Sequence, residues 1–402
     1  MLLDAFYPTD IRVYKEATAL IQAGYEVHLL CKRRKGEQTY EEVDRLKVHR
    51  INAGKSNMAK GIVDVITAIN FVNPFFRKAL PDFITSNEIN VLHIHDLPLF
   101  KTGFEMKHKY NLKLVADFHE NYPEALKVWF TWKKNKLLRL KNSLFFSYNR
   151  WKSYETFAIK KADYLIAVVE EMKNRIVDQN ICDETKIFVV TNTEEKSFAN
   201  SPIDTNIYGL KDEYIITYTG NIGPHRGIDT AIKAMTYLKD KPEIKLYIVG
   251  SGSKSVMEKL HTLIKENAVS DQVKMMGYQP FSRFFSFMKM ANVNTIPHHS
   301  NDHTDNTVPH KLFQAMMTGK PLLVSSSRSL KRIVEATGSG LVFEAGNARD
   351  FASKVTMLYT NQQLSGQLGS NGLQATLKGS CHWENTAKKL QALYHDIQSC
   401  PG

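Results

Sequence analysis

The feature that most constrains the fold is a repeated alternation of short apolar runs with segments of helical periodicity. Apolar runs without strict polar–apolar alternation, separated by helices, are typical of parallel sheets buried on both faces. The sequence therefore predicts an α/β protein made of doubly wound parallel sheets. The runs are YEVHLLC (25–31), VLHIHD (91–96), KLVADFH (113–119), YLIAVV (164–169), IFVVTN (187–192), YIITYTG (214–220), KLYIVG (245–250), VKMMG (273–277), VNTIPH (293–298), PLLVSS (321–326) and GLVFEAG (340–346).

One interruption of this alternation divides the chain. A length of 402 residues exceeds what a single core ordinarily holds, so two domains are expected. Periodicity is lost around residues 196–210, where Ser, Asn and Pro accumulate. We therefore expect one domain over residues 1–203, a second over 204–378 and a separate C-terminal segment over 379–402.

Composition excludes several classes of protein. Hydrophobic residues make up 43% of the chain and charged residues 23%, which is globular composition rather than wholesale disorder. No apolar run reaches the ~18 residues that a membrane crossing needs. The start, MLLDAFYPTD, lacks the pattern of a signal peptide, and 4 cysteines are too few for a disulfide framework. We expect a cytoplasmic protein whose net charge of +12 favours anionic partners.

The first candidate site is the glycine-rich loop at residues 220–227, which follows the run YIITYT and precedes a helical pattern. Glycines let a ligand approach the backbone, and a helix start offers N–H groups to an anion. Arg226 adds a planar fork that matches phosphate oxygens. The loop matches neither a Walker motif nor a dinucleotide fingerprint, and a simple strand-to-helix turn explains it about as well.

The second candidate site is the polar loop at residues 297–310, which ends in a predicted helix start at Pro309. Lys311 would then lie in the first helical turn, where the helix dipole disfavours a cation unless an anion occupies the site. Four of the 14 histidines fall in this loop. Their spacing fits no standard pair of metal ligands on a helix, so we expect no metal there.

Histidines also end two strands of the first half. His95 precedes Asp96, and His119 leads directly into a polar loop that begins with Glu120. A histidine at such a strand end can contact a sugar hydroxyl or transfer a proton, and one of these histidines can equally be a packed core residue.

The segment at residues 127–161 has an unusual composition. It contains ten Lys or Arg residues against the single acid Glu155, and three of the 4 tryptophans of the chain. Cations beside aromatic residues suit the interface of an anionic membrane, and we predict that residues 127–152 lie against one. A helix with a solvated charged face is the competing interpretation. A single-stranded nucleic-acid groove is disfavoured because no recognisable nucleic-acid module accompanies the segment.

These motifs together resemble a known family. The order DIRVYKEA, VLHIHD, ADFHENYPE, ADYLIAVVEEM, YTGNIGPHRGID, VPHKLFQAMMTGKPLLVSS and HWENTAKKLQALY resembles the retaining glycosyltransferases of family 4, over nearly the whole chain. The resemblance implies the GT-B fold, with two Rossmann-like domains that face a cleft. It further implies an acceptor-side N-terminal domain, a C-terminal domain that binds the nucleotide sugar, and a last helix that packs back on the first domain.

The resemblance also implies an activity and a set of site residues. The activity is retaining transfer of a sugar from a nucleotide-diphosphate donor to a glycan or lipid-linked acceptor, without a metal or another cofactor, for surface polysaccharide or glycolipid synthesis at the membrane. The catalytic candidates are His119, Arg226 and Lys311; the donor-binding candidates are Gly220, Asn221, Gly223, Gly250, Tyr278, Asn306, Thr307, Val308 and Gln314; the acceptor-side candidates are Asp10, Arg12, His95 and Glu120.

Two positions depart from the family pattern. Where the family often carries two glutamates eight positions apart, this chain has Asn306 and Gln314, and the common Gly-Arg pair is Gly220-Asn221. A glutamine amide can still accept a hydrogen bond from a ribose hydroxyl, but without charge assistance. Two alternatives therefore stay open: a non-catalytic GT-B subunit that binds a nucleotide or a partner, and a nucleotide-sugar epimerase.

Overall fold

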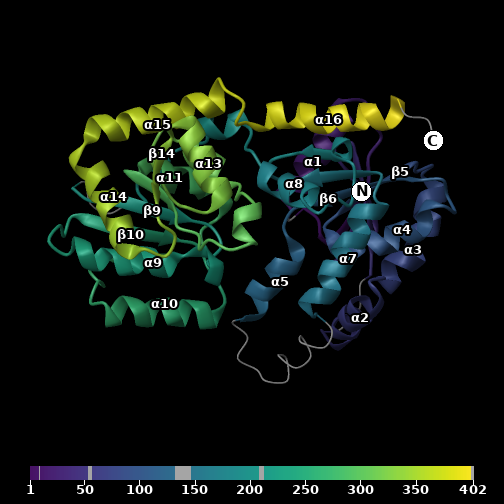
Figure 1. Cartoon of the computed structure of the whole chain (residues 1–402), viewed down its shortest axis with the longest axis horizontal. Coiled ribbons are helices and arrows are strands. Elements are labelled where there is room, and N and C mark those ends of the chain that lie inside the picture. Colours follow the sequence, from purple (N-terminus) through teal and green to yellow (C-terminus); the bar gives the residue numbers. More distant parts are fainter. Residues whose placement is uncertain (9, 53–56, 132–145, 208–211, 400–402) are drawn as a thin grey trace. The chain divides into compact units, whose positions relative to one another are not determined.

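The computed structural model describes residues 1–8, 10–52, 57–131, 146–207 and 212–399, which form two compact units (Figure 1). The first unit comprises Met1–Thr191 and Ala387–Gly402, and the second comprises Asn192–Thr386. The chain therefore enters the second unit at residue 192, earlier than the expected division at 203/204, and its last segment belongs to the first unit from Ala387 onward.

The first unit contains an eight-stranded sheet in the order β3-β4-β2-β1-β5-β6-β7-β8. All neighbouring strands are parallel except β3 and β4, which form an antiparallel hairpin. The elements are β1 (Leu2–Phe6), α1 (Ile11–Gln22), β2 (His28–Lys32), β3 (Tyr40–Val43), β4 (Leu46–Ile51), α2 (Asn57–Asn70), α3 (Pro74–Ser86), β5 (Val91–His95), α4 (Phe100–Lys107), β6 (Lys113–Phe118), α5 (Tyr122–Thr131), α7 (Tyr148–Lys161), β7 (Tyr164–Ala167), α8 (Glu170–Val177), β8 (Ile187–Val189) and α16 (Trp383–Ser399), with short 3₁₀ helices at Leu97–Leu99 and Glu184–Lys186.

The second unit contains a six-stranded sheet in the order β11-β10-β9-β12-β13-β14, with every neighbouring pair parallel. The elements are β9 (Tyr214–Thr219), α9 (Ile228–Ala234), β10 (Ile244–Val249), α10 (Lys254–Glu266), β11 (Val273–Gly277), α11 (Phe284–Met290), β12 (Val293–Ile296), α12 (Lys311–Met316), β13 (Leu322–Ser325), α13 (Arg328–Thr337), β14 (Gly340–Phe343), α14 (Ala348–Thr360) and α15 (Gln362–Leu377), with 3₁₀ helices at Lys196–Asn200, Pro224–Arg226, Met235–Leu238, Phe281–Arg283 and Thr304–Asn306.

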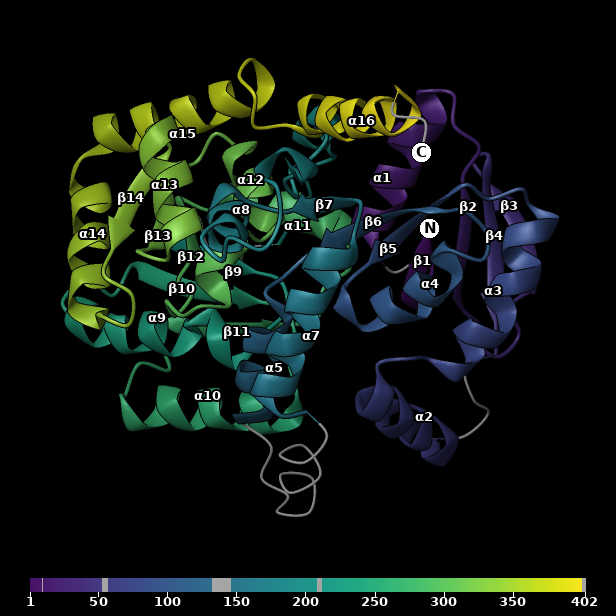
Figure 2. The same cartoon turned by 45° about the vertical axis from the view of Figure 1, so that its right-hand side comes forward.

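Local sequence explains how these elements begin and end. The side chain of Asp10 accepts a hydrogen bond from the backbone N–H of Arg12 and so caps α1, as the sequence predicts. Gly24, just beyond the end of α1, has a φ of +92°. Strands β9 and β10 consist almost entirely of buried residues, because helices cover both faces of the sheet (Figures 1 and 2).

Helix α16 lies against α1 of the first unit (Figures 1 and 2). Gln391 donates from Nε2 to the backbone carbonyl of Ala19 at 3.0 Å, and the Tyr394 hydroxyl lies 2.9 Å from Nδ1 of His93. These bonds attach the last helix of the chain to α1 and to strand β5 of the first unit.

Candidate active site

The two loops that the sequence singles out in the second unit lie side by side. They follow β9 and β12, which are neighbouring parallel strands, so both leave the sheet at its carboxyl edge. The backbone N–H of His299 donates to the carbonyl of His225 at 3.1 Å and joins the loops directly.

Close backbone approach makes two glycines of this region necessary. A Cβ atom on Gly227, whose φ is +63°, would lie 1.7 Å from the carbonyl oxygen of Pro297. A Cβ atom on Gly250, whose φ is +141°, would lie 1.9 Å from the carbonyl oxygen of Gly220. Only glycine fits both the backbone conformation and the space, and the loops can therefore lie against each other.

Arg226 is held by a histidine of the neighbouring loop. Its Nη1 lies 3.1 Å from Nε2 of His298, and because a guanidinium only donates, this imidazole nitrogen must accept. The proton of the neutral His298 ring is therefore on Nδ1. Arg226 Nε is buried without a hydrogen-bond partner among the described residues. Arg226 thus retains an unused donor in a buried place, which favours an anionic ligand.

Lys311 supplies a second cation to the same place. Its Nζ donates to the carbonyl of Thr219 at 3.0 Å and lies 3.6 Å from the centre of the Tyr218 ring. A Cβ atom on Gly220 would lie 3.7 Å from this Nζ, so the ammonium group borders the glycine-rich loop.

The electrostatics of this region favour an anionic ligand. The pKa of Lys311 is far below its usual value because of burial and the nearby charge of Arg226. Burial and Arg226 likewise lower the pKa of His225 to about 2 and that of His298 well below its usual value. Within the described part of the chain, neither Arg226 nor Lys311 has a carboxylate within ion-pair distance. We refer to Arg226, Lys311, His225 and His298 as the cation cluster.

The segment from Asn306 to Val308 is the last part of the second loop before α12. Asn306 belongs to a short 3₁₀ helix and donates from Nδ2 to the carbonyl of Asp302 at 2.8 Å. Ser329, in the first turn of α13, donates to the carbonyl of Thr307 at 2.6 Å, and Val308 is buried. These contacts fix the backbone between the loop and α12.

Helix α12 starts later than the sequence predicts. It begins at Lys311, so Pro309 precedes it and His310 occupies the cap position. Lys311 does lie in the first turn, as expected. The second residue of the predicted pair, Gln314, is buried in α12 and donates to the carboxylate of Glu194 at 2.7 Å. Sequence analysis missed Glu194; its only signal is an acidic pair, Glu194 and Glu195, directly after a buried run.

Two donor-binding candidates differ from the rest in exposure. The side chain of Tyr278 is 75% exposed, just after β11, and Asn221 is exposed at the tip of the glycine-rich loop. Gly223 lies between Asn221 and His225 in sequence, and a Cβ atom there would lie 3.2 Å from the His225 ring. The second unit therefore contains every predicted donor-binding residue together with Arg226 and Lys311.

The first unit brings the remaining candidates around one buried carboxylate. Oδ2 of Asp117, on β6, lies 2.8 Å from Nδ1 of His95 and makes a close contact with Nε2 of His119. Nε2 of His93 lies 3.4 Å from this same oxygen and 3.4 Å from Oε2 of Glu16. All five side chains are buried, and we refer to them as the histidine–carboxylate cluster.

The charges of this cluster determine the protonation of His119. Burial and the charge of Arg12 lower its pKa, but Asp117 and Asp96 outweigh them and raise it to about 9. Burial and the charge of Asp117 raise the pKa of Glu16 well above its usual value. The cluster therefore holds His119 as a cation and Asp117 as an anion at neutral pH.

The acceptor-side candidates at the chain start form an ion pair. Arg12 donates from Nε and Nη2 to the two carboxylate oxygens of Asp10 at 2.9 and 2.6 Å. Burial raises the pKa of Asp10, but this bidentate pair outweighs burial and lowers it overall. Glu120 is half-buried directly after His119.

Four side chains of the histidine–carboxylate cluster have the composition of a metal site. Glu16, His95, Asp117 and His119 each offer one ligand atom, and these atoms lie within 4.8 Å of one another. The contacts of Asp117 with His95 and His119 already have hydrogen-bonding geometry, so the same side chains also form a charge network with one another.

Comparison with known families identifies the family of the chain. Residues 10–193 match the model of glycosyltransferase family 4, and residues 201–375 match the model of group 1 glycosyl transferases. The chain belongs to the family 4 glycosyltransferases. Its two parallel-sheet units have the GT-B fold, as the sequence predicts, and the matches extend over both candidate sites.

Relatives of this glycosyltransferase are distant in sequence. An uncharacterized glycosyltransferase of Methanocaldococcus jannaschii is 24% identical over 360 residues, which cover 89% of this chain and 88% of the relative. The capsular polysaccharide biosynthesis glycosyltransferase CapM of Staphylococcus aureus is 23% identical over 272 residues, which cover 64% of this chain and 68% of CapM.

Solved structures show the same fold at lower identity. Sucrose-phosphate synthase of Thermosynechococcus elongatus superimposes with a TM-score of 0.77 at 17% identity, covering 97% of this chain and 93% of that protein. HepE of Anabaena, solved in complex with UDP-glucose, superimposes with a TM-score of 0.73 at 13% identity, covering 99% and 98% of the two chains.

The basic aromatic segment is only partly described. Its residues 132–145 lie outside the described part of the glycosyltransferase. Trp151, which the membrane hypothesis counted among the interfacial tryptophans, is 2% exposed and packs against Tyr154 and Phe71, so its role is in the core. Trp129 is 39% exposed. Among the described residues, no helix has the length and apolar character of a membrane-spanning segment.

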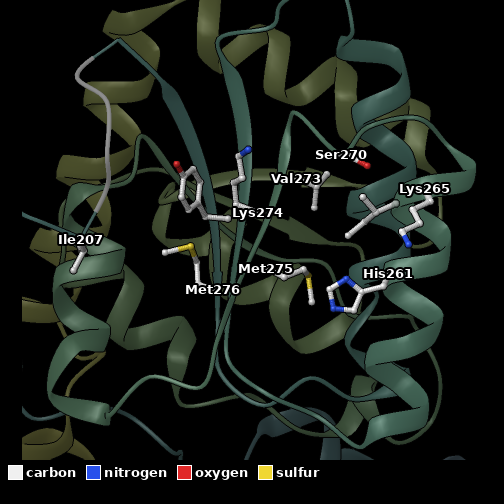
Figure 3. Close-up of a pocket in the computed structure, with 10 residues that line it drawn as sticks. Ile207, His261, Lys265, Ser270, Val273, Lys274, Met275 and Met276 are labelled. Carbon is white, nitrogen blue, oxygen red and sulfur yellow. The ribbon is translucent and has the colours of Figure 1, made fainter.

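A pocket at the edge strand β11 is distinct from these sites (Figure 3). It lies beside Met275 and Met276, with His261 and Lys265 of α10 opposite them. None of the predicted site residues lines this pocket, and we assign it no part in sugar transfer.

Proposed function

We propose that this glycosyltransferase transfers a sugar, with retention of anomeric configuration, from a nucleotide-diphosphate sugar to a glycan or lipid-linked acceptor. The observation that carries the proposal is the cation cluster of the second unit. Arg226 and Lys311 are held at the carboxyl edge of a parallel sheet without a carboxylate partner among the described residues, and a diphosphate would neutralise both.

The same cations would act in catalysis. Negative charge accumulates on the diphosphate as the bond to the sugar breaks, and prearranged cations stabilise that charge most in the transition state. In this proposal the departing phosphate helps to deprotonate the acceptor hydroxyl, and no side chain of the protein acts as a nucleophile. Positively charged His119 contacts the sugar or the acceptor, and Asp10, Arg12, His95 and Glu120 belong to the acceptor side.

The comparisons support this proposal through what similar proteins bind and make. HepE was solved with UDP-glucose, and CapM is named for capsular polysaccharide biosynthesis. We infer by analogy that the donor is a nucleotide sugar and that the product is a surface polysaccharide or glycolipid. We also infer that the reaction needs no metal or other cofactor, since cations of the protein itself take the place of a metal beside the diphosphate.

Calorimetry with UDP, GDP and ADP, each free and as its glucose conjugate, tests the proposal. We expect one base to bind, with the same affinity in the presence of EDTA, and we expect slow hydrolysis of its sugar conjugate without acceptor. The configuration of the released sugar, followed by NMR at early times, tests retention. Binding without any hydrolysis or transfer would instead support a non-catalytic nucleotide-binding subunit, and conversion of the donor sugar without acceptor would support an epimerase.

We further propose that the enzyme works in the cytoplasm, bound peripherally to an anionic membrane that carries its acceptor. Support comes from the basic composition of residues 127–161 and from a described surface beside them. A pocket there is lined by Phe71, Phe157, Lys101 and Arg150, among others, and Ile69 of α2 is 53% exposed next to it. Each cation near an anionic surface contributes about 1 kcal/mol.

Cosedimentation with vesicles tests membrane binding. Wild type should bind phosphatidylserine-containing vesicles but not neutral ones. It should dissociate as salt rises, because screening shortens the electrostatic range to about 8 Å at physiological ionic strength. Charge reversal of Lys133, Lys134, Lys136 and Arg139 should abolish this binding without changing UDP affinity. Equal partitioning of both proteins to both kinds of vesicle would reject the membrane proposal and leave the donor proposal intact.

A further inference from the structure

The residue that replaces a family glutamate is bonded to a carboxylate from elsewhere in the chain. Gln314, on α12, donates from Nε2 to Oε2 of Glu194 at 2.7 Å, although 120 positions separate the two residues. Both side chains are buried, and both belong to the second unit. A carboxylate is therefore present beside position 314, supplied by the loop after β8 instead of by α12.

The remaining contacts of Glu194 fix its position. Its Oε1 accepts the backbone N–H of Glu195 at 2.8 Å, and its own backbone carbonyl accepts the N–H of Trp383 at 2.8 Å. Nε2 of His310 lies 3.2 Å from Oε2 of Glu194. The carboxylate thus has donors on both oxygens, as a buried charge requires.

These contacts also determine where the protons lie. Nε2 of His310 is 3.0 Å from the carbonyl oxygen of Thr193, which can only accept, so this nitrogen carries a proton. Nδ1 of His310 lies 3.4 Å from Nε2 of Gln314, and with the proton on Nε2 it is the nitrogen that can accept from this amide. The amide group of Gln314 therefore directs its two N–H bonds to Glu194 and His310, and a carboxylate at position 314 has no such hydrogens to give.

We propose that Glu194 is a positioning residue for the nucleotide-sugar site. It fixes the carboxamide of Gln314 with the nitrogen toward itself, so that Oε1, the acceptor of that side chain, is left for a hydroxyl of the donor ribose. The inference rests on the proposed function, because it assigns Gln314 to the donor site. It explains why glutamine at position 314 is compatible with donor binding. The negative charge of Glu194, bonded to the nitrogen of the amide, strengthens the amide oxygen as a hydrogen-bond acceptor.

This arrangement reverses the expectation that restoring the family glutamate would improve binding. Gln314→Glu would bring two buried carboxylates to hydrogen-bonding distance, where both cannot be ionised without strong repulsion, and it would remove the donor to His310. Exchange of the two residues, Glu194→Gln with Gln314→Glu, places an amide donor opposite a carboxylate again.

The experiment measures affinity for UDP, 2′-deoxy-UDP and 3′-deoxy-UDP by calorimetry, and thermal unfolding, for wild type and five variants. The variants are Gln314→Glu, Glu194→Ala, Glu194→Gln, the exchanged double variant and Gln363→Glu. The last is a control that makes the same charge change at an exposed position of α15.

Four results are expected. Wild type should lose roughly fivefold to tenfold in affinity when the contacted ribose hydroxyl is removed, which is the usual worth of one hydrogen bond. Gln314→Glu should bind UDP at least about tenfold more weakly than wild type, and the double variant should recover most of that loss. Glu194→Ala should stop distinguishing UDP from its deoxy analogues, whereas Glu194→Gln should retain most of the distinction. The Gln363→Glu control should match wild type.

The discrimination between UDP and its deoxy analogues separates positioning from a structural role, because loss of stability alone would not change it. Gln314→Glu binding UDP as tightly as wild type, or folded Glu194→Ala keeping full discrimination, would overturn the inference while wild-type UDP binding upholds the proposed function. Failure of wild type to bind UDP, GDP or ADP would instead remove the proposed function, and this inference with it.

Discussion

The two units each place a group of charged and titratable side chains at the carboxyl edge of a parallel sheet, but the groups differ in balance. In the histidine–carboxylate cluster, Asp117 contacts His93, His95 and His119, so positive and negative groups meet directly. In the cation cluster, Arg226 contacts neutral His298, and Lys311 contacts a carbonyl and an aromatic ring. In the first group opposite charges are in contact, whereas in the second the charges of Arg226 and Lys311 contact only neutral groups among the described residues.

The difference separates stability from binding. A buried charge with its partner in place contributes to the folded state, and removing one partner leaves the other uncompensated. Neighbouring like charges reduce stability unless a ligand neutralises them, so their presence indicates a place where a ligand of opposite charge can bind. Loss of the central carboxylate of the first cluster should therefore be measured mainly in unfolding, and changes in the second cluster mainly in donor binding and catalysis.

The largest effect is expected for Asp117→Asn. Removing the anion leaves the buried, cationic His119 with only the more distant carboxylate of Asp96, 3.8 Å away, and the free energy of unfolding should fall by about 3–5 kcal/mol. Thermal and denaturant unfolding measure this loss. Asp240→Asn, whose side chain is 68% exposed in wild type, is the matched control. A change of similar size in both variants would contradict the assignment of a balanced cluster.

Arg226→Ala should lower kcat/KM for sugar transfer by the equivalent of about 2–4 kcal/mol, the usual value of one prearranged electrostatic donor. Its unfolding temperature should stay near that of wild type, because the lost cation had no carboxylate partner among the described residues. Arg283→Ala is the matched control, because it removes a cation that does have a carboxylate partner: Nη2 of Arg283 lies 2.9 Å from Oδ2 of Asp204. Near-normal transfer by Arg226→Ala at low donor concentration would exclude the phosphate role.

Acidification should lower the free energy of unfolding of the protein through His298 of the cation cluster. Its pKa in the folded state is lowered, so its contribution to stability is complete above the unfolded value of 6.5 and is lost as pH falls below it. Between pH 6.5 and pH 5 this buried histidine should account for about 2 kcal/mol of lost stability. The measurement is unfolding across this range for wild type and His298→Gln, and parallel curves for the two proteins would contradict the prediction.

Lys311→Met should have a small effect on stability, of the opposite sign to that of Asp117→Asn. Replacing the cation removes its repulsion with Arg226 and its burial, so unfolding should become harder by up to about 1 kcal/mol. UDP should at the same time bind about tenfold more weakly, which is the loss of one charge-assisted contact. A variant that unfolds more easily while binding UDP normally would place Lys311 among the stabilising residues instead.

Sequence alone predicts those features that local pattern determines. The glycines at 220–227 and the cap at Asp10 are visible within a few residues, so the loops and the elements around them are predictable. The hairpin of β3 and β4 was missed because β4 alternates buried positions with half-buried polar ones such as Lys47, unlike the central strands, which are buried almost throughout.

Contacts between distant residues stay hidden for a different reason. Gln314 and Glu194 meet across 120 positions, and His93 and Tyr394 across 301. Their meeting depends on the order of strands and on the return of α16, neither of which leaves a periodic trace. Gln314 alone therefore suggested a lost charge, whereas its neighbour Glu194 provides one.

The contact of the glycine-rich loop with its neighbours bears on how this enzyme could be given a new sugar specificity. Positions 227 and 250 admit no side chain at all, since a Cβ atom at either would overlap a backbone carbonyl. Random mutagenesis that included them would produce mostly misfolded protein. Asn221, after β9, and Tyr278, after β11, are exposed, so their side chains can vary without disturbing the core. A library restricted to these two positions would keep the anion site while sampling new surroundings for the donor.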